Sequence, residues 1–304
     1  MTLAVRHAYK QKFHTAINVV GLAVGLAASL LIAWYVMDEM SYDKFHQDAE
    51  RTFRITTNGG ESYHLATTPA RLAPIIRQDI PEVEAIARVF TWNHSTMRLA
   101  DDPEKVFRET SIYIADSTFL DVLDFNLIAG DTDALDATNA LVLTRATAER
   151  YFGTGSVEQG EVLGKEILFG GNRTARVVTG VVDPPSATHF SFDMLVPTTG
   201  YGELIDNENW SWNFLYTYLK VQEGVADDPQ KMAALQEKLD QIVEQHVKPA
   251  FRAENPGELE SDIRYELQAV TDIHLHSDLR REHQVNGNIS TVYTLTAVAV
   301  LILM

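Results

Sequence analysis

The sequence predicts an α+β domain held between two membrane helices. Two apolar runs bracket the chain: one from Ile17 to Met37 carries no charge, and one from about residue 290 is still apolar at Met304. Between them, strand-like and helix-like patterns alternate without a strict repeat or a low-complexity stretch. The expected organisation is a basic arm (1–16), a first span (17–37), a folded domain (38–288) and the start of a second, truncated span (289–304).

The first apolar run is predicted to be a retained membrane helix. At about 1.5 Å per residue it covers the roughly 30 Å hydrocarbon core of a bilayer. The alternative is a cleaved signal peptide, whose apolar core usually has about 7 to 15 residues and ends at a small-residue cleavage site. Here Trp34, Tyr35 and then Asp38 follow instead. The retained helix is favoured, with the two aromatic rings at the outer interface.

The charges that flank this run predict its orientation. Basic residues precede it without any acidic residue among them, namely Arg6, Lys10 and Lys12. Acidic residues crowd its other end, namely Asp38, Glu39, Asp43, Asp48 and Glu50. Positive charge stays on the cytoplasmic side, so residues 38–288 are expected to be exported and the second run to return. The 14 residues from Thr291 cannot complete a crossing; this run is either a membrane-inserted stub or, as we favour, part of a fragmentary chain.

Composition excludes some partners. The formal net charge is −17, and a field of that sign repels nucleic-acid backbones. It also disfavours anionic lipid headgroups away from the basic arm. The chain has no cysteine, so disulfides are excluded and the exported domain must be held by its core.

The first part of the domain is expected to alternate strands and helices. The prediction continues the span as a helix from Ser41 to Arg51, followed by a strand (51–58) and a helix (69–79). Residues 84–92 and 95–100 read as a hairpin, and 105–115 as a third strand beyond the Asp101-Asp102-Pro103 turn.

The later part has the same mixed texture. Expected elements are a short helix (116–125), a strand (140–144), a helix stopped by Gly153 (145–152), a hairpin across 170–172, and strands at 190–197 and 213–221, the last half-buried. The longest helix opens at Asp227 or Asp228, has Pro229 in its first turn and runs to Lys248-Pro249. Residues 262–275 are predicted to return as a strand toward the membrane.

No catalytic or cofactor-binding residues are predicted. The Gly155–Gly160 segment resembles a phosphate loop but lacks its lysine, and its glycines fit turns. Neither a GxSxG elbow nor an HExxH pair occurs, and there is no thiol nucleophile. A membrane-anchored enzyme is therefore disfavoured.

Two small clusters invite a binding interpretation. Alternate residues on the returning strand would put His274 and His276 on one face, near His283, Asp272 and Asp278. Two histidines make a weak metal site, so polar residues in a returning loop are the favoured reading, and no metal ligand is predicted. Trp210 and Trp212 could stack on a ligand, but core or interface aromatics are favoured.

One face of the first span consists of small residues, namely Gly21, Gly25, Ala28 and Ser29. Such a face lets another helix approach closely, which favours packing in a bundle or a dimer. The alternative is the ordinary glycine content of membrane helices.

Several segments together resemble one family. They are INVVGLAVGLAASLLIAWYV with the following DEMSYDKFHQDAERTFRI, then TRATAERYFG, VLGKEI, VTGVVDPPSATHFSFDML, TDIHLHSDL and NGNISTVYTLTAVAVLIL. In this order they resemble ABC transporter permeases of the MacB and FtsX type, particularly Bacteroidetes-like ones. The resemblance covers essentially the whole chain as the N-terminal part of such a protein.

The resemblance implies a bacterial inner-membrane permease subunit with an exported, mixed α/β, two-lobed domain. One lobe would be porter-like and the other, at about 116–200, Sabre-like. It implies an ABC ATPase as a separate subunit that holds ATP and Mg, so this chain itself would bind no cofactor. A homodimer or paired permease, the lipid bilayer and a periplasmic adaptor or outer-membrane protein are further expected partners.

The function expected from the resemblance is export of lipoprotein, peptide, lipid or drug, driven by the partner's ATP hydrolysis. The alternative is an FtsX-like regulator that activates a cell-wall hydrolase without transport. In either case the connectors between membrane and domain would transmit movement. The connector residues are Asp38, Glu39, Ser41, Tyr42, Asp43, Phe45, His46, Asp272, His274, Asn286 and Gly287. The sequence identifies neither the cargo nor the ATPase.

Overall fold

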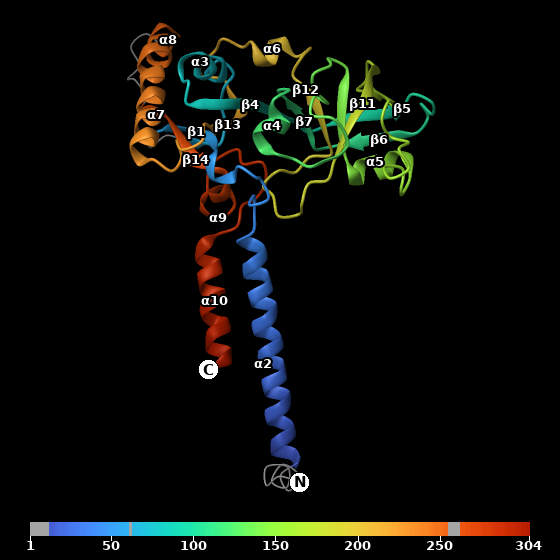
Figure 1. Cartoon of the computed structure of the whole chain (residues 1–304), viewed down its shortest axis with the longest axis vertical. Coiled ribbons are helices and arrows are strands. Elements are labelled where there is room, and N and C mark those ends of the chain that lie inside the picture. The colour runs from blue at the N-terminus through green and yellow to red at the C-terminus, as the bar shows by residue number, and fades with distance from the viewer. Residues whose placement is uncertain (1–11, 61–62, 255–261) are drawn as a thin grey trace.

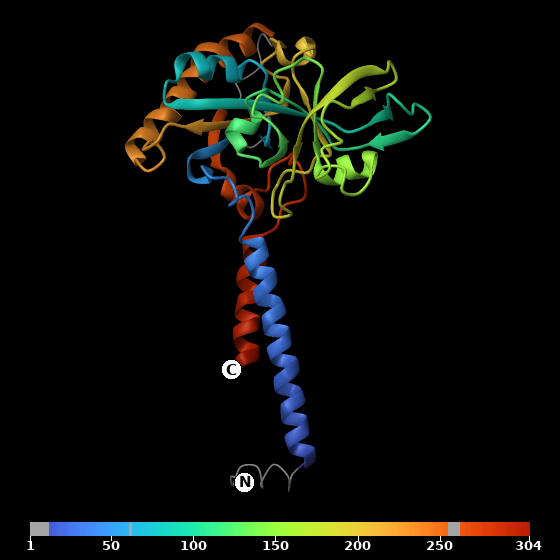
Figure 2. The same cartoon turned by 45° about the vertical axis from the view of Figure 1, so that its right-hand side comes forward.

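The computed structural model describes residues 12–60, 63–254 and 262–304 and shows a broad domain standing on two helices (Figure 1). Helix α2 (Lys12–Glu39) and helix α10 (Ile289–Leu303) leave the same side of the domain and contact one another, as a second view shows (Figure 2). The predicted span 17–37 lies within α2. Among the described helices, only α2 is long and apolar enough to cross a membrane. The start of the basic arm, residues 1–11, lies outside the described residues.

The strands form one continuous sheet. Its first half contains β14 (Ile263–Ala269), β1 (Thr52–Gly59), β13 (Asn213–Val221) and β4 (Val83–Trp92). Its second half contains β7 (Ile112–Ala115), β12 (Met194–Pro197), β9 (Ala140–Thr144), β11 (Thr174–Val182), β10 (Glu166–Phe169), β5 (Ser95–Leu99) and β6 (Val106–Glu109). The described strands are hydrogen-bonded in the order just given. Three short strands, β2 (His64–Leu65), β3 (Thr68–Pro69) and β8 (Leu127–Gly130), pair with β1, β13 and β11.

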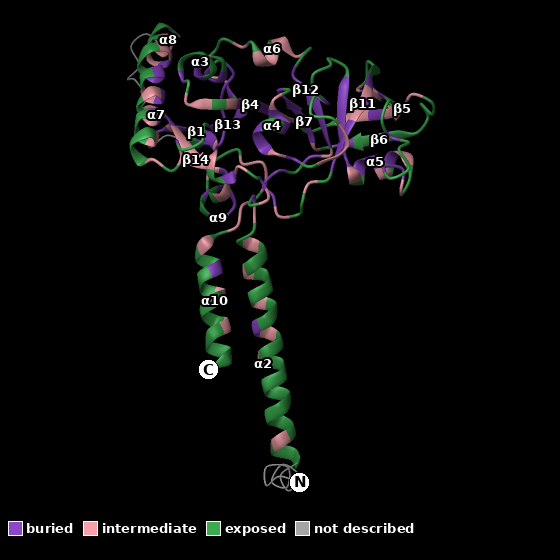
Figure 3. Cartoon of the chain, viewed as in Figure 1, coloured by how far each residue is buried: buried purple, intermediate pink, exposed green. Residues whose placement is uncertain are grey.

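Helices cover this sheet and divide its buried side chains into three cores. The helices are α3 (Leu72–Asp79), α4 (Phe119–Leu123), α5 (Arg145–Phe152), α6 (Gly202–Ile205), α7 (Pro229–Ile242), α8 (Lys248–Glu254) and α9 (Ile273–His276). One core packs α3 and α7 on β1, β13 and β4, and another packs α5 on β9, β10 and β11. The third lies between them around α4, and Figure 3 shows the buried positions concentrated in the domain. The predicted α+β class is confirmed.

The longest helix begins as predicted and continues beyond its predicted end. The Asp228 side chain accepts from the backbone N–H groups of Gln230 and Lys231, and Pro229 occupies the first turn. The predicted end at Lys248-Pro249 is wrong, because a π-helical turn (Val243–Val247) leads directly into α8. Pro249 is tolerated in the first turn of α8.

One predicted pairing and one predicted strand in the sheet are corrected. Strands β4 and β5 exist, but they do not form a hairpin: β4 pairs with β13 and β7, whereas β5 pairs with β6 and β10. The predicted strand 105–115 is broken into β6 and β7. The hairpin across residues 170–172 is confirmed by the β10–β11 pairing. Strand β13 is almost fully buried rather than half-buried, because it lies between β1 and β4.

Both connectors differ from their predicted secondary structure. The chain turns repeatedly after Glu39, and only Ala49–Arg51 forms a 3₁₀ turn (η1), so the predicted helix from Ser41 is wrong. The predicted strand 262–275 ends at Ala269, after which a 3₁₀ turn and α9 follow. In both segments, contacts with other parts of the domain replace regular hydrogen bonding.

The strand pairing also shows which residues accompany the predicted lobe at about 116–200. Strands β5 and β6 precede the predicted 116–200 lobe in sequence, yet β5 is hydrogen-bonded to β10 within that region. Residues 95–109 therefore belong to the same part of the sheet as β10 and β11, at the right of Figure 1. The porter-like and Sabre-like identities of the two parts stay predictions.

Candidate functional site

The two connectors meet at the base of the domain, in what we call the junction: residues 38–48, 183–193 and 270–290. Residues 38–48 leave α2, and residues 270–290 lead into α10. Residues 183–193 join β11 to β12 and cross between the other two segments. The junction is thus built from three distant stretches of sequence.

Asp43 holds the first connector to the crossing segment. Its side chain is fully buried, and its Oδ1 accepts from the Thr188 hydroxyl at 2.8 Å and from the His189 backbone N–H at 3.1 Å. Its own backbone N–H donates to Ala187 O at 3.0 Å. The φ angle of Asp43 is 58°, in the left-handed region that aspartate tolerates better than most residues. This conformation is incompatible with the predicted helix from Ser41.

A buried aspartate–histidine pair sets the electrostatics of this contact. His189 Nδ1 lies 2.8 Å from Asp43 Oδ2, and His189 Nε2 is 2.9 Å from the Tyr218 hydroxyl on β13. Burial alone would raise the pKa of Asp43. The charge interaction with His189 and the hydrogen bonds from His189 and Thr188 outweigh that effect, so the pKa lies below its usual value. Asp43 is therefore a buried anion at neutral pH.

His46 occupies the aromatic part of the junction. Its Nδ1 donates to Leu123 O at the end of α4, and its ring packs against Phe45, Phe125 and Phe190. Burial lowers the pKa of His46 to about 4, although Asp43, 3.9 Å away, opposes that shift. The imidazole is therefore neutral at physiological pH and belongs to the central core.

The second connector packs directly on the end of α2. His274 Nε2 donates to Glu39 Oε2 at 3.0 Å, and the Tyr42 ring stacks on the His274 ring with centroids 3.4 Å apart. A Cβ on Gly287 would lie 2.5 Å from Glu39 Oε2 and 2.9 Å from His274 Nε2. Because glycine has no Cβ, the backbone at position 287, just before α10, can lie directly against Glu39 and His274.

The second connector is also tied to the sheet. Arg54 on β1 is fully buried and makes a bidentate ion pair with Glu282, with distances of 2.5 and 2.9 Å. Arg54 also donates to Gln268 on β14. His283 stacks on Tyr216 of β13 with centroids 3.6 Å apart, and burial holds the pKa of His283 well below its usual value. Bidentate guanidinium pairs fix orientation as well as position.

Part of the predicted small-residue face of α2 packs against α10. Ser29 is buried, and its hydroxyl donates to Ala299 O at 3.3 Å. A Cβ on Gly25 would meet Ile302 Cγ2 at 3.3 Å, and Ala28 is half-buried. Gly21 is exposed and has open space around it. Within the described helices, Gly25 and Ser29 therefore pack the two helices of the same chain together.

All the predicted connector residues lie within the junction, but not all of them make contacts across it. Phe45 packs on the central core, and Asn286 donates to Ser277 O at 3.1 Å. Asp38 and Asp272 are exposed, and the Ser41 hydroxyl donates only locally, to Asp38 O. Sequence reasoning missed Thr188, His189, Tyr218 and Glu282. The crossing segment DPPSATHF contributes to the family resemblance, but nothing in its sequence indicates a contact with Asp43.

The metal and aromatic clusters have structural roles. His274 and His276 lie on the short helix α9, so the premise that a strand would align them is wrong. Among the residues that the structure describes, no group of three or more His, Asp or Glu side chains could hold a metal ion. Trp210 is buried in the α3–α7 core, and Trp212 packs against Phe214.

Comparisons with known proteins agree with this architecture. The model of the MacB-like periplasmic core domain family matches residues 15–242. A domain of a putative permease protein from Porphyromonas gingivalis is similar at 25% identity, with a TM-score of 0.57, over 74% of this chain and 92% of that one. The periplasmic region of MacB from Actinobacillus actinomycetemcomitans is also similar, at 16% identity and a TM-score of 0.49, over 73% of this chain and 90% of that one. A search of curated proteins finds no match.

Proposed function

Since the chain belongs to the MacB-like periplasmic core domain family, we propose that it is the permease subunit of an ABC transporter whose junction passes movement between membrane and exported domain. The apolar helix α2 fits an inner-membrane protein. Its N-terminus would lie in the cytoplasm and the sheet domain in the periplasm, as the flanking charges favour. The cargo class is a lipoprotein, peptide, lipid or drug.

The observation that carries this proposal is the meeting of both connectors at one buried site. Glu39 and His274 join the end of α2 to the segment before α10, while Asp43 and Arg54 join these segments to the rest of the domain. A tilt of either helix would therefore displace the domain base rather than bend a loop. Buried polar contacts resist such bending because breaking one leaves an unpaired group.

The energy source is proposed to be a separate ABC ATPase subunit, which would hold ATP and Mg. A homodimer or paired permease would place two junctions side by side, and a periplasmic adaptor or outer-membrane protein would receive the cargo. The outer faces of α2 and α10 are exposed and apolar, which suits contact with lipid or with another permease (Figure 3).

The first experiment isolates the protein from its own membranes after chemical cross-linking and identifies what accompanies it. We expect a subunit with a nucleotide-binding GxxxxGK[ST] loop, and ATP hydrolysis by the isolated complex. Recovery without any ATPase, in several detergents, would contradict the proposal. Recovery with a cell-wall hydrolase that is active only in the complex would instead establish the regulator alternative.

The second experiment tests the junction as the coupling element. Gly287→Ala should displace Glu39 from His274, because the new methyl group would meet the side chains of Glu39 and His274 at 2.5 and 2.9 Å and that of Leu275 at 3.2 Å. We expect ATP hydrolysis to persist while export falls. Gly171→Ala is the matched control, since a Cβ there meets open space. Normal export by Gly287→Ala would refute the coupling role of this contact.

A further inference from the structure

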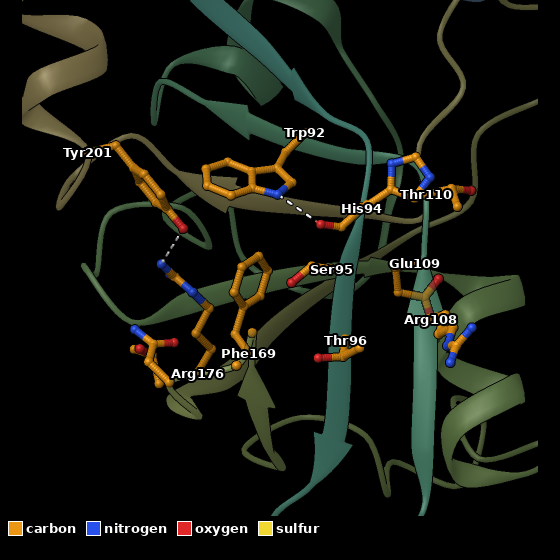
Figure 4. Close-up of a pocket in the computed structure, with 14 residues that line it drawn as sticks. Trp92, His94, Ser95, Thr96, Arg108, Glu109, Thr110, Phe169, Arg176 and Tyr201 are labelled. Carbon is orange, nitrogen blue, oxygen red and sulfur yellow. Dashed lines mark hydrogen bonds between the residues drawn. The ribbon is translucent and has the colours of Figure 1, made fainter.

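The end of the sheet that holds β5 and β6, at the right of Figure 1, carries an open groove of about 690 Å³. It lies where β4, β5, β6, β10 and β11 end near Tyr201, the residue before α6. Figure 4 shows its lining side chains. The volume falls within the range of small-molecule binding sites.

Aromatic rings form one side of the groove. The rings of Trp92 and Tyr201 meet edge to face with centroids 6.2 Å apart, and Phe169 lies beside them (Figure 4). The Trp92 indole N–H donates to His94 O at 3.0 Å, so its hydrogen-bonding group is already used. Trp92 is still 40% exposed. Trp92 therefore offers a ligand in the groove an aromatic ring face rather than a hydrogen-bond donor.

The buried charged groups of the groove are held by the protein in different ways. The Arg176 guanidinium donates to Thr138 O, Ala140 O and the Tyr201 hydroxyl, and it lies over the Phe169 ring. These partners are neutral, and its buried Nε has no hydrogen-bond partner among the described residues. The Glu109 carboxylate accepts from the Tyr151 hydroxyl and from Arg150. Arg108 is exposed at the rim. Glu109 is therefore paired, whereas the charge of Arg176 has no acidic partner among the described residues.

Hydroxyl and amide groups form the other side. They belong to five lining residues: Ser95, Thr96, Thr110, Asn172 and Thr174. Within the described residues, none of these side chains makes a hydrogen bond. Each can both donate and accept. A purely apolar ligand would cover them without giving them partners, which costs free energy.

We propose that this groove binds a saccharide. A sugar ring combines an apolar C–H face, which would stack on Trp92 and Tyr201, with hydroxyls at its edge, which would pair with Ser95, Asn172 and Thr174. The site lies outside the junction and goes beyond the coupling function, so it can be present whether or not the chain takes part in transport.

The experiment titrates the full chain in lipid nanodiscs with chitotriose, cellotriose and maltotriose and follows tryptophan fluorescence. Nanodiscs avoid glycoside detergents, whose headgroups are themselves sugars. We expect saturable binding of at least one trisaccharide. Trp92→Ala should weaken it roughly three- to tenfold through the loss of stacking, and Trp92→Phe less. Combined Asn172→Ala and Thr174→Val should also weaken it.

The control variant is Trp212→Ala, which removes a tryptophan that packs on Phe214 outside the groove and should leave the affinity unchanged. Failure of all three sugars to bind saturably overturns the proposal, as does binding that Trp92→Ala leaves intact. An apolar fluorescent dye that binds through Trp92 and is not displaced by any of the sugars would also overturn it and assign an apolar ligand instead.

Discussion

Asp43 is the residue on which the junction depends most. It is fully buried, adopts a left-handed backbone conformation and accepts hydrogen bonds from both Thr188 and His189. A strained backbone persists only where the surroundings enforce it, and such residues cluster where proteins switch or clamp. Its position just beyond the span made Asp43 a predicted connector. Its partners were not predictable, because they lie 145 and 146 residues further along the chain.

The first prediction concerns the charge of Asp43. Asn at this position keeps the shape and tolerates the left-handed backbone, but its amide donors would oppose the donors of Thr188 and His189. We expect Asp43→Asn to lower the free energy of unfolding by about 1–3 kcal/mol. Thermal unfolding followed by circular dichroism checks this. Asp272→Asn, at an exposed position, is the control, and equal melting temperatures for both variants would count against the role of Asp43.

The second prediction follows from the lowered pKa of His46, about 4 against an ordinary 6.5. Between these pH values the unfolded chain binds the proton and the folded chain does not, so stability falls as pH falls from about 6.5 to about 4. The full effect is roughly 3 kcal/mol. The pKa of His283 is also lowered, so this residue adds a further loss of stability as the pH falls. His46→Gln should flatten the pH dependence of the melting temperature, whereas His64→Gln, at an exposed position, should not.

Among the elements, α2 was the most predictable and the connectors the least. An uncharged apolar run of span length leaves the backbone no alternative to a helix in lipid. Residues 41–51 carry a helical pattern too, but the buried Asp43 contacts override it. Likewise, His274 and His276 are expected on a strand because local alternation cannot reveal that Ala269 is the last residue paired with β1.

The third prediction tests the packing of α2 on α10. Because the chain has no cysteine, Gly25→Cys with Ile302→Cys provides a single pair. A Cβ at position 25 would lie 3.3 Å from Ile302 Cγ2, so the two side chains are in direct contact. We expect rapid intramolecular cross-linking, seen as faster gel migration before reduction. Gly21→Cys with Ile302→Cys should not cross-link within the chain, since Gly21 has no neighbour within 4 Å. Cross-linking only between chains would mean that α10 packs on a different α2.

At the scale of the whole molecule, the continuous sheet joins three cores that would otherwise be separate. Strands β7 and β12 link the β4 side to the β9–β11 side through parallel and antiparallel pairing. The sequence predicted most of these strands but not their order, because spatial order depends on contacts between distant segments. The saccharide groove was likewise beyond prediction. Trp92, Phe169 and Tyr201 are scattered over the sequence and meet only through the sheet.

The fourth prediction is that the sheet and the junction make one rigid body with α2. Spin labels at Met37→Cys, at the end of α2, and Leu163→Cys, in the far part of the domain, both replace exposed residues. We expect one narrow distance distribution by pulsed electron resonance. Asp43→Ala should broaden it, since the first connector then loses its anchor to Thr188 and His189, whereas Asp272→Ala should not. A broad distance distribution in the parent protein would mean that movement of α2 is absorbed before it reaches the domain. An unchanged narrow distribution in Asp43→Ala would show that the Arg54–Glu282 anchor is sufficient alone.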